Sequence, residues 1–438
     1  MSAAPPLGKA RRVPAVAPTH AGVDEAPDPY PYVTTRRLRE QRWLLEATIR
    51  QIGIDWDQGR SRYTAYAAGL DAEPDFARIR ERVRKFGDIH REFASAAARR
   101  ERLSEAAESD GRTVEAREHA FVASILWGNA QWPLFGNSPL VLELGDRKTA
   151  CFDRFIRHAP HPVRRVEVPF GEATLPGILH LPRSGEPPFP LFIQIGGMDS
   201  FKEHQVAIYG DKVLERGMAR LAIEIPGQGV ALERGLFATE TSAAEAGRAF
   251  VAWARGQLDL RPDGIIVAGN SFGSFWATQI AAAVDGLAGC AVAGLIHEPG
   301  MHEIFETASP TFKARFMYMS GFDDEDAFDE FAARLDLRPV ASAVDCPYLA
   351  IAGEDDELSP LQHTFDLLRR IPAPVDLVVY RGERHSIGAG AAAAFGPNRH
   401  HLIAGWAQDR QAGKPVRDRY RVVDTTGAVT DREPVWRP

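Results

Sequence analysis

The chain has 438 residues, and its apolar and charged fractions, 45% and 25%, are typical of a globular protein with a main domain and a smaller second one. Its 52 basic residues, fewer than its 59 acidic ones, form no stripe, and no apolar run is long enough to cross a membrane, so neither nucleic acid nor a membrane is an expected partner. Three scattered cysteines favour reduced thiols in a cytoplasm over a disulfide framework.

The N-terminal part of the chain is predicted to be a tail followed by helices. Residues 1–31 are rich in Ala and Pro, lack the apolar core of a secretory signal, and are predicted to be a mobile tail. Apolar residues then recur at helical spacing over 34–52, 75–105 and 114–127. We therefore predict an all-α domain over 32–160. Whether this domain is a structural cap or dimer surface, or takes part in substrate binding, stays open.

An aromatic segment, Trp127–Phe135, places two Trp and one Phe around polar amides near the end of this domain. Trp132, with Asn129 and Gln131 beside it, suits a pocket for a ring-bearing substrate and is a candidate substrate contact. The same residues suit the seam between two domains. We favour the seam, and the pocket is the alternative.

Beyond the helical domain, apolar strands alternate with helices. The expected strands are 166–168, 175–181, 191–195, 219–225, 265–268, 291–296, 348–352 and 375–380, and the expected helices between them include one from about residue 202, one over 241–258 and one over 274–284. This alternation predicts an α/β domain over 161–412, with a mostly parallel sheet of about eight strands flanked by helices. A helical lid is expected at about 300–343, and a C-terminal tail at 413–438.

One strand and the helix after it are joined by the pentapeptide Gly269-Asn-Ser-Phe-Gly273. Strand, sharp turn and helix is the context of a nucleophile elbow, which leaves the hydroxyl of Ser271 clear at the carboxyl end of the strand. Gly269 and Gly273 are needed because a Cβ at either position would clash in so tight a turn. A chance match is the alternative, but the context favours Ser271 as a nucleophile.

A serine nucleophile needs a base, and the base needs a carboxylate to orient it. With this kind of elbow, the chain order is Ser, then Asp or Glu, then His. The strand 348–352 leads to Gly353 and an acidic cluster. We choose Asp356 as the acid because it lies three residues beyond Gly353 and four before Pro360, and Asp355 is the alternative.

The base is expected after the last strand, where the loop beyond Tyr380 carries His385. A loop histidine without a role is the alternative. The other histidines have no metal-ligand spacing with a matching Cys or carboxylate, so we predict no metal and no cofactor.

Two backbone N–H groups are expected to stabilise the negative charge that develops during acyl transfer. One is that of Phe272, the residue after the nucleophile. The other belongs to the loop Gly196-Gly-Met198, which we assign to Met198, with Gly197 as the alternative.

The string Gly196-Gly-Met-Asp-Ser-Phe-Lys-Glu203 and the elbow together resemble a subgroup of the α/β-hydrolases. The subgroup includes 2,6-dihydroxypseudooxynicotine hydrolase, fungal pigment hydrolases that shorten polyketide chains, and FrsA-like proteins, and the resemblance covers about 114–406. It implies an α/β-hydrolase fold with an N-terminal helical domain, a Ser271–Asp356–His385 triad and a homodimer. It further implies bracing of the oxyanion loop by Asp199 and Lys202, with Asp199 also a candidate substrate contact. An additional site glutamate is implied as well, for which the candidates are Glu298 and Glu303.

The resemblance also limits the reactions that we expect. Some members cleave a carbon–carbon bond beside a ketone, and others are esterases or acyl-transfer enzymes. The leading hypothesis is therefore C–C bond hydrolysis in an aromatic or polyketide-derived ketone. A carboxylesterase, thioesterase or acyltransferase using the same residues is one alternative, and a non-catalytic FrsA-like binding or regulatory protein is another. The aromatic lid residues suit an aromatic substrate, or they dock the lid on the helical domain.

Overall fold

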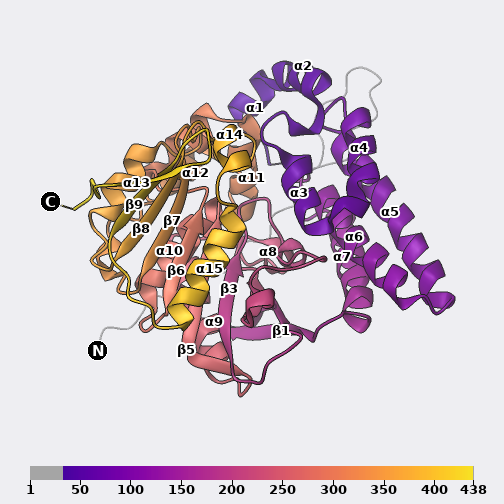
Figure 1. Ribbon diagram of the computed structural model, residues 1–438. Coiled ribbons are helices and arrows are strands. Elements are labelled where there is room, and N and C mark those ends of the chain that lie inside the picture. The colour runs from indigo at the N-terminus through magenta and orange to yellow at the C-terminus, as the bar shows by residue number, and fades with distance from the viewer. Residues whose placement is uncertain (1–32, 438) are drawn as a thin grey trace.

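A mixed sheet of ten strands lies at the centre of the fold in a computed structural model that describes residues 33–437 (Figure 1). In chain order the strands are β1 Val163–Phe170, β2 Ala173–His180, β3 Phe189–Ile195, β4 Ala219–Ile223, β5 Leu260–Asn270, β6 Gly289–Ala293, β7 Tyr348–Gly353, β8 Val375–Tyr380, β9 Arg419–Val423 and β10 Val429–Arg432. Their order across the sheet is β1-β2-β4-β3-β5-β6-β7-β8-β9-β10. β2 runs antiparallel to both its neighbours and β10 runs antiparallel to β9, whereas the other pairs are parallel. The predicted α/β class is confirmed, and the tail predicted for 1–31 lies outside the described residues.

Two of these strands occupy the segment 413–438, where the sequence predicts a C-terminal tail. β9 pairs in parallel with β8, and the guanidinium of Arg421 in β9 donates to the carboxylate of Asp376 in β8 at 2.7 and 3.1 Å. Trp436, beyond β10, is 3% exposed and joins the main core. The segment was not recognised because charged residues interrupt both short strands and leave too short an apolar pattern to indicate β structure.

A helical unit precedes the sheet and forms the indigo to purple part of Figure 1. Its helices are α1 Arg36–Glu40, α2 Arg42–Ile52, α3 Arg60–Ala68, α4 Glu73–Arg82, α5 Asp88–Ser109, α6 Thr113–Gln131 and α7 Pro139–Arg157. The single helix predicted over 75–105 is interrupted, because the Asp88 carboxylate accepts the N–H groups of Arg84 and Lys85 in a turn before α5. The apolar pattern does not indicate α3 or α7. From residue 33 to residue 437, no helix has the length and apolar character that crossing a bilayer requires.

Side chains of the central strands alternate between two hydrophobic cores. On one face, Ile265 and Val267 of β5 belong to the core that includes α9 (Ser242–Arg255), α10 (Phe272–Ala283) and α13 (Leu361–Leu368). On the other face, Ile266 and Ala268 belong to the core that includes α14 (Ala391–Phe395) and α15 (Arg399–Gln411). Burial on both faces explains why β5 has a continuous apolar run rather than an alternating one.

The connection from β3 to β4 lacks the helix that the sequence predicts from about Lys202. This fully described connection contains two short 3₁₀ turns instead, Lys202–His204 and Leu214–Arg216. Lys202 and Glu203 are buried in ion pairs, so polar contacts hold the segment where an amphipathic helix would use an apolar stripe. A short helix, α8 (Gly229–Glu233), follows β4.

A helical segment lies between β6 and β7, where the lid is predicted. It contains a π-helical turn, Glu303–Thr307, followed by α11 (Pro310–Ser320) and α12 (Glu325–Ala332). The ring of Phe316 stacks on that of Phe272 with centroids 4.4 Å apart. Phe305 and Phe316 therefore dock the lid on α10 of the sheet domain, whereas the hydroxyl of Tyr318 contacts Asn137 of the helical unit.

The aromatic segment Trp127–Phe135 lies at the seam between the helical unit and the sheet domain. Trp132 is 3% exposed, and its ring lies 5.7 Å from that of Trp56 and 6.0 Å from that of Phe86. Phe135 belongs to the main core of the sheet domain, whereas Trp132 belongs to the core of the helical unit. The seam interpretation fits this placement.

We predict that Trp132→Ala lowers the free energy of unfolding by about 3–5 kcal/mol, because it removes a large buried ring and leaves a cavity. Trp43 in α2 is the matched control, since it is 72% exposed. Trp43→Ala is expected to change the free energy of unfolding by about 0.5 kcal/mol or less. Urea unfolding followed by circular dichroism measures both. Equal effects of the two substitutions would contradict a structural role of Trp132 at the seam.

Candidate active site

The turn at Ser271 joins the end of β5 to the start of α10. Ser271 has φ 57°, a backbone conformation that a residue with a side chain rarely adopts. A Cβ on Gly269 would overlap the carbonyl group of Gly273, and a Cβ on Gly273 would lie 2.5 Å from the carbonyl oxygen of Ile195. The close contacts expected from the sequence are thus present, and both positions require glycine.

The structure brings together the three side chains predicted as a triad. Ser271, Asp356 and His385 follow the carboxyl ends of β5, β7 and β8. The Nε2 atom of His385 lies 2.9 Å from the Oγ of Ser271, and its Nδ1 lies 2.9 and 3.0 Å from the carboxylate oxygens of Asp356. Asp356 is buried, whereas the alternative acid Asp355 is exposed. The contacts therefore favour Asp356.

The surroundings of His385 favour its protonated form. Burial alone would lower the pKa of His385, but the charge and hydrogen bond of Asp356 outweigh it and raise the pKa above its ordinary value. Asp356 is itself held by the N–H groups of Leu358 and Ser359 at 2.9 and 3.2 Å. Glu357 accepts the backbone N–H of His385 at 3.1 Å, which fixes the loop that carries the imidazole.

Two backbone N–H groups beside Ser271 are free. Within residues 33–437, neither Phe272 nor Met198 donates its backbone N–H to a protein acceptor. The loop before Met198 lies close to the serine, since a Cβ on Gly197 would be 2.9 Å from the Cβ of Ser271. The side-chain amide of Gln228 donates to the carbonyls of Gly196 and Gly197 at 3.0 and 3.1 Å, which fixes the orientation of this loop.

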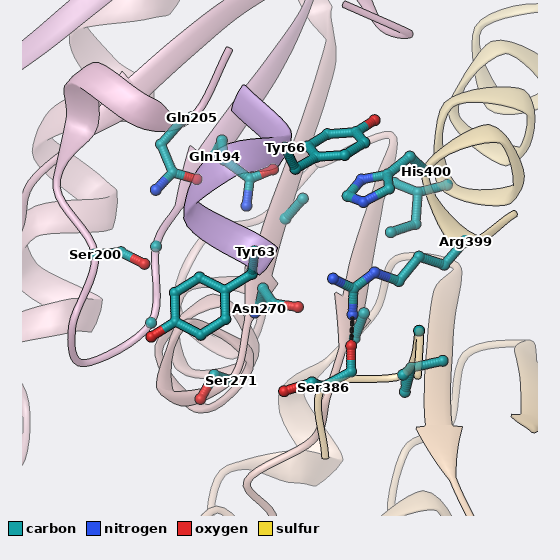
Figure 2. Close-up of a pocket in the computed structure, with 18 of the residues that line it drawn as sticks. Tyr63, Tyr66, Gln194, Ser200, Gln205, Asn270, Ser271, Ser386, Arg399 and His400 are labelled. Atoms are coloured by element: carbon teal, nitrogen blue, oxygen red, sulfur yellow. Dashed lines mark hydrogen bonds between the residues drawn. The ribbon is translucent and has the colours of Figure 1, made fainter. Parts of the chain in front are cut away.

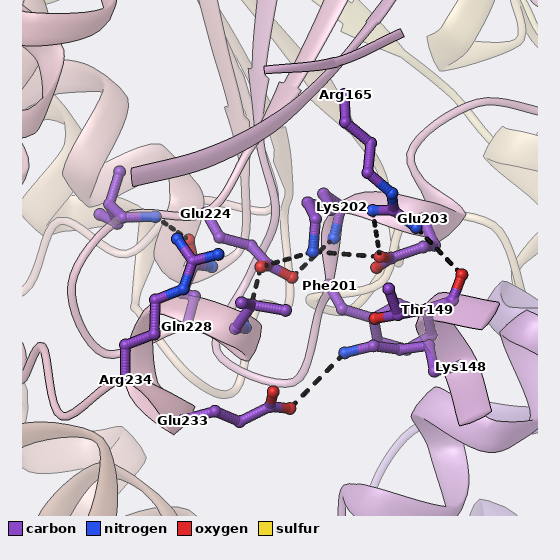
Figure 3. A network of polar contacts seen from close by, with 12 residues as sticks. Lys148, Thr149, Arg165, Phe201, Lys202, Glu203, Glu224, Gln228, Glu233 and Arg234 are labelled. Carbon is purple, nitrogen blue, oxygen red and sulfur yellow. Dashed lines mark hydrogen bonds and ion pairs between the residues drawn. The ribbon is translucent and has the colours of Figure 1, made fainter. Parts of the chain in front are cut away.

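A buried ion network braces the loop that contains Gly197 and Met198, and Figure 3 shows its side chains. The Nζ of Lys202 lies 2.9 Å from Glu224 and 3.0 Å from Glu203, and all three side chains are almost completely buried. Glu224 also accepts the backbone N–H of Lys202 at 3.1 Å. Burial would lower the pKa of Lys202, but the two carboxylates outweigh it and raise the pKa, so the ammonium stays charged. This placement agrees with the bracing role that the resemblance implies for Lys202.

Asp199 connects the loop to the helical unit. One of its carboxylate oxygens lies 3.0 Å from the guanidinium of Arg60 in α3, and Arg60 stacks 3.4 Å above the ring of Trp132. Asp199 lines the cavity beside Ser271, whereas Trp132 is not among the described residues that line it. The geometry gives no support to a substrate contact at Trp132, because Arg60 lies over its ring and pairs with Asp199.

The two candidate glutamates lie at the start of the lid. The carboxylate of Glu298 is largely buried and accepts the backbone N–H of Glu303 at 2.8 Å. Of the described residues, neither glutamate lines the cavity that contains Ser271. Their contacts are those of a cap at the beginning of the lid, so a direct role at the site has no geometric support here.

Ser271 opens into a cavity of about 480 Å³ between the helical unit and the sheet domain (Figure 2). The lid contributes Ile304 and Phe312 to the lining. Residues that the sequence analysis missed make up much of the rest, namely Tyr63 and Tyr66 of α3, Gln194 of β3, and Arg399 and His400 of α15. No motif marks them, because they come from three elements that meet only in the folded chain. The helical unit is thus part of the cavity wall.

Metal-ligating side chains do not gather in the described part of the chain, where no group of three or more His, Cys, Asp or Glu is placed to hold an ion.

Comparison with solved structures identifies the fold. The crystal structure of 2,6-dihydroxy-pseudo-oxynicotine hydrolase aligns with a TM-score of 0.70 and 25% sequence identity, over 81% of this chain and 97% of that chain. The chain has the α/β-hydrolase fold. AbyA5, whose structure aligns with a TM-score of 0.57 over 80% of this chain and 99% of its own, has the same fold at 18% identity.

Sequence comparison finds relatives in the predicted subgroup of α/β-hydrolases. The Esterase FrsA-like family matches residues 87–245, and the Prolyl oligopeptidase family matches 237–412. The 2,6-dihydropseudooxynicotine hydrolase of Paenarthrobacter nicotinovorans is 30% identical over 246 residues, 55% of this chain and 64% of that protein. Alpha/beta hydrolase gkaG of Penicillium citrinum is 31% identical over 203 residues, 44% of this chain and 47% of that protein. Esterase FrsA of Yersinia enterocolitica is 25% identical over 108 residues, 24% of this chain and 26% of that protein. The resemblance is confirmed, although the chain spans less than two thirds of each of these curated relatives.

We predict that Lys202→Met destabilises the fold by about 3–5 kcal/mol, because it leaves the buried carboxylates of Glu203 and Glu224 without their cation. Lys212 is the matched control, since its ion pair with Glu215 is solvent-exposed. Lys212→Met is expected to cost about 1 kcal/mol or less. Urea denaturation midpoints compare the two variants. A Lys202→Met protein as stable as Lys212→Met would contradict the bracing role.

Proposed function

We propose that the protein is a serine hydrolase in which Ser271 is the nucleophile, His385 the general base and Asp356 the group that orients the base. The observation that carries this proposal is the continuous chain of hydrogen-bonding distances, 2.9 Å from Ser271 to His385 and 2.9 Å on to Asp356, at the wall of a cavity. The free amides of Phe272 and Met198 support it, because they suit stabilisation of an oxyanion.

The proposed reaction is hydrolysis of a C–C bond next to a carbonyl in an aromatic or polyketide-derived ketone. His385 takes the proton of Ser271 as the oxygen attacks the carbonyl carbon, and the two amides stabilise the resulting oxyanion. When the tetrahedral species collapses, the C–C bond breaks and its electron pair leaves on a carbon stabilised by a neighbouring carbonyl or phenol ring. The imidazolium of His385 protonates that carbon. Water, activated by His385, then hydrolyses the acyl-enzyme and restores Ser271.

The similarity to proteins named 2,6-dihydropseudooxynicotine hydrolase and gkaG supports C–C bond hydrolysis as the leading reaction. The Esterase FrsA-like match supports the rival, a carboxylesterase, thioesterase or acyltransferase with the same triad. An aryl β-diketone and a p-nitrophenyl ester distinguish them. Diketone cleavage supports the leading reaction, and rapid ester turnover without diketone cleavage would overturn it in favour of the rival.

Covalent labelling tests whether the site is catalytic at all. We predict that a fluorophosphonate labels the folded protein, and that Ser271→Ala abolishes both the label and turnover without unfolding the chain. The exposed Ser184 is a control, and Ser184→Ala is expected to keep the label. Mass spectrometry locates the adduct. A folded protein that takes no label would favour the FrsA-like binding or regulatory protein instead.

The raised pKa of His385 predicts a pH profile for ester turnover. Catalysis requires the neutral imidazole, so kcat/KM is expected to fall as the pH drops through the pKa of His385, and the acid limb should lie above the ordinary histidine value of about 6.5. Asp356→Asn removes the charge that raises this pKa, so the limb should move to lower pH. The same variant is expected to lower kcat by about 10⁴-fold. An acid limb that Asp356→Asn leaves in place would contradict the assigned pair.

We also propose a cytoplasmic homodimer acting on a small molecule, with no metal or cofactor, no nucleic acid partner and no membrane attachment. The support is the resemblance to the subgroup, the composition and the scattered cysteines. Sedimentation velocity of the purified chain tests the dimer, and a monomer at micromolar concentration would contradict it.

A further inference from the structure

The cavity beside Ser271 carries uneven charge. Among residues 33–437, two carboxylates line it, and each already has a cation: Asp199 is paired with Arg60, and Asp211 with Arg220. Arg399 and the exposed Arg62 also line the cavity, and no carboxylate of the described residues forms an ion pair with either of them. The charge that remains uncompensated in the cavity is therefore positive.

Arg399 is the first residue of α15, and one arm of its guanidinium donates to the backbone carbonyl of Ser386, the residue after His385 (Figure 2). The carboxylate of Glu383 acts on it electrostatically but is occupied, since it accepts the N–H groups of Gly388, Ala389 and Ala393 at 2.9, 3.2 and 3.0 Å. Burial lowers the pKa of the Arg399 guanidinium, and the groups around it do not fully offset this effect. A bound anion would therefore stabilise the charged guanidinium of Arg399.

Besides Glu383, the side chains near Arg399 include neutral hydrogen-bonding groups. His400 stacks on Tyr66 with centroids 4.3 Å apart, and burial lowers the pKa of His400 to about 3, so it adds no charge near neutral pH. Tyr63, Tyr66 and Asn270 line the same cavity and bring two hydroxyls and an amide to it. The cavity thus offers the guanidinium of Arg399 with additional hydrogen-bonding groups, in a space open to Ser271.

We propose that Arg399 binds a carboxylate of the substrate, so that the protein acts on acyl compounds that carry a carboxylate away from the bond that is cleaved. A planar guanidinium offers paired N–H donors that match the two oxygens of a carboxylate. Its contact with Ser386 positions the bound carboxylate on the His385 side of the cavity. This inference rests on the proposed function, and it adds the chemical class of the substrate.

The test compares two esters of equal acyl length, mono-p-nitrophenyl glutarate and p-nitrophenyl valerate. The unsubstituted protein is expected to have a kcat/KM at least tenfold higher for the glutarate ester. Arg399→Gln should remove that preference, mainly through KM, and Arg399→Lys should retain part of it. Arg417→Gln removes an exposed arginine outside the cavity lining and should keep the full preference. No preference in the unsubstituted protein, or equal loss on both esters in Arg399→Gln, would overturn the subsite.

A binding measurement separates this inference from the proposed function. Ser271→Ala is expected to bind glutarate in isothermal titration calorimetry, and adding Arg399→Gln should weaken that binding at least tenfold. Unchanged binding in the double variant would overturn the subsite even if ester turnover is intact. Conversely, if neither ester is turned over and a fluorophosphonate does not label Ser271, the proposed function fails while calorimetry still tests the carboxylate site.

Discussion

The close approach of two backbone segments at Ser271 is the constraint on which the site depends. Gly273 lies against the carbonyl of Ile195, and Gly269 lies against Gly273, so the strand–turn–helix connection closes only because hydrogen occupies both Cβ positions. The positive φ of Ser271 is the cost of that closure, and it presents the hydroxyl above the sheet. Because the turn also carries Phe272, the same constraint sets the nucleophile and one of the free amides.

The position of the other free amide, that of Met198, depends on a buried ion network. The loop through Met198 follows β3 without a helix behind it, and Lys202, Glu203 and Glu224 hold it with contacts of 2.9 to 3.1 Å. Charged groups are costly to bury without a counter-charge, so the pairing of Lys202 with both carboxylates favours this arrangement of the loop. A rigid loop of this kind suits an oxyanion hole, where donors must be positioned before the charge develops.

The helical unit contributes to the site through direct contact with this loop. Gly128 in α6 leaves room for the ring of Phe201, which a Cβ there would overlap. Arg60 in α3 reaches Asp199 from the other side, and Tyr63 and Tyr66 of the same helix complete the cavity wall. Cavity shape and charge therefore depend on how the two parts of the chain dock. Gly128, Arg60 and Asp199 are far apart in sequence, and only the fold brings them to the same loop.

The sequence by itself determined the elements whose signal is local. The apolar run before Ser271, its two glycines, and the positions of Asp356 and His385 after later strands were sufficient to predict the α/β sheet and the group of three side chains at its edge, because parallel strands end on the same side. Tertiary structure alone decided the rest. Strands β9 and β10, the division of the helix predicted over 75–105, and the positions of Trp132, Glu298 and Arg399 relative to the cavity depend on partners distant in the chain. No short window of sequence contains those partners, and a buried charge or a cavity wall is defined only once they meet.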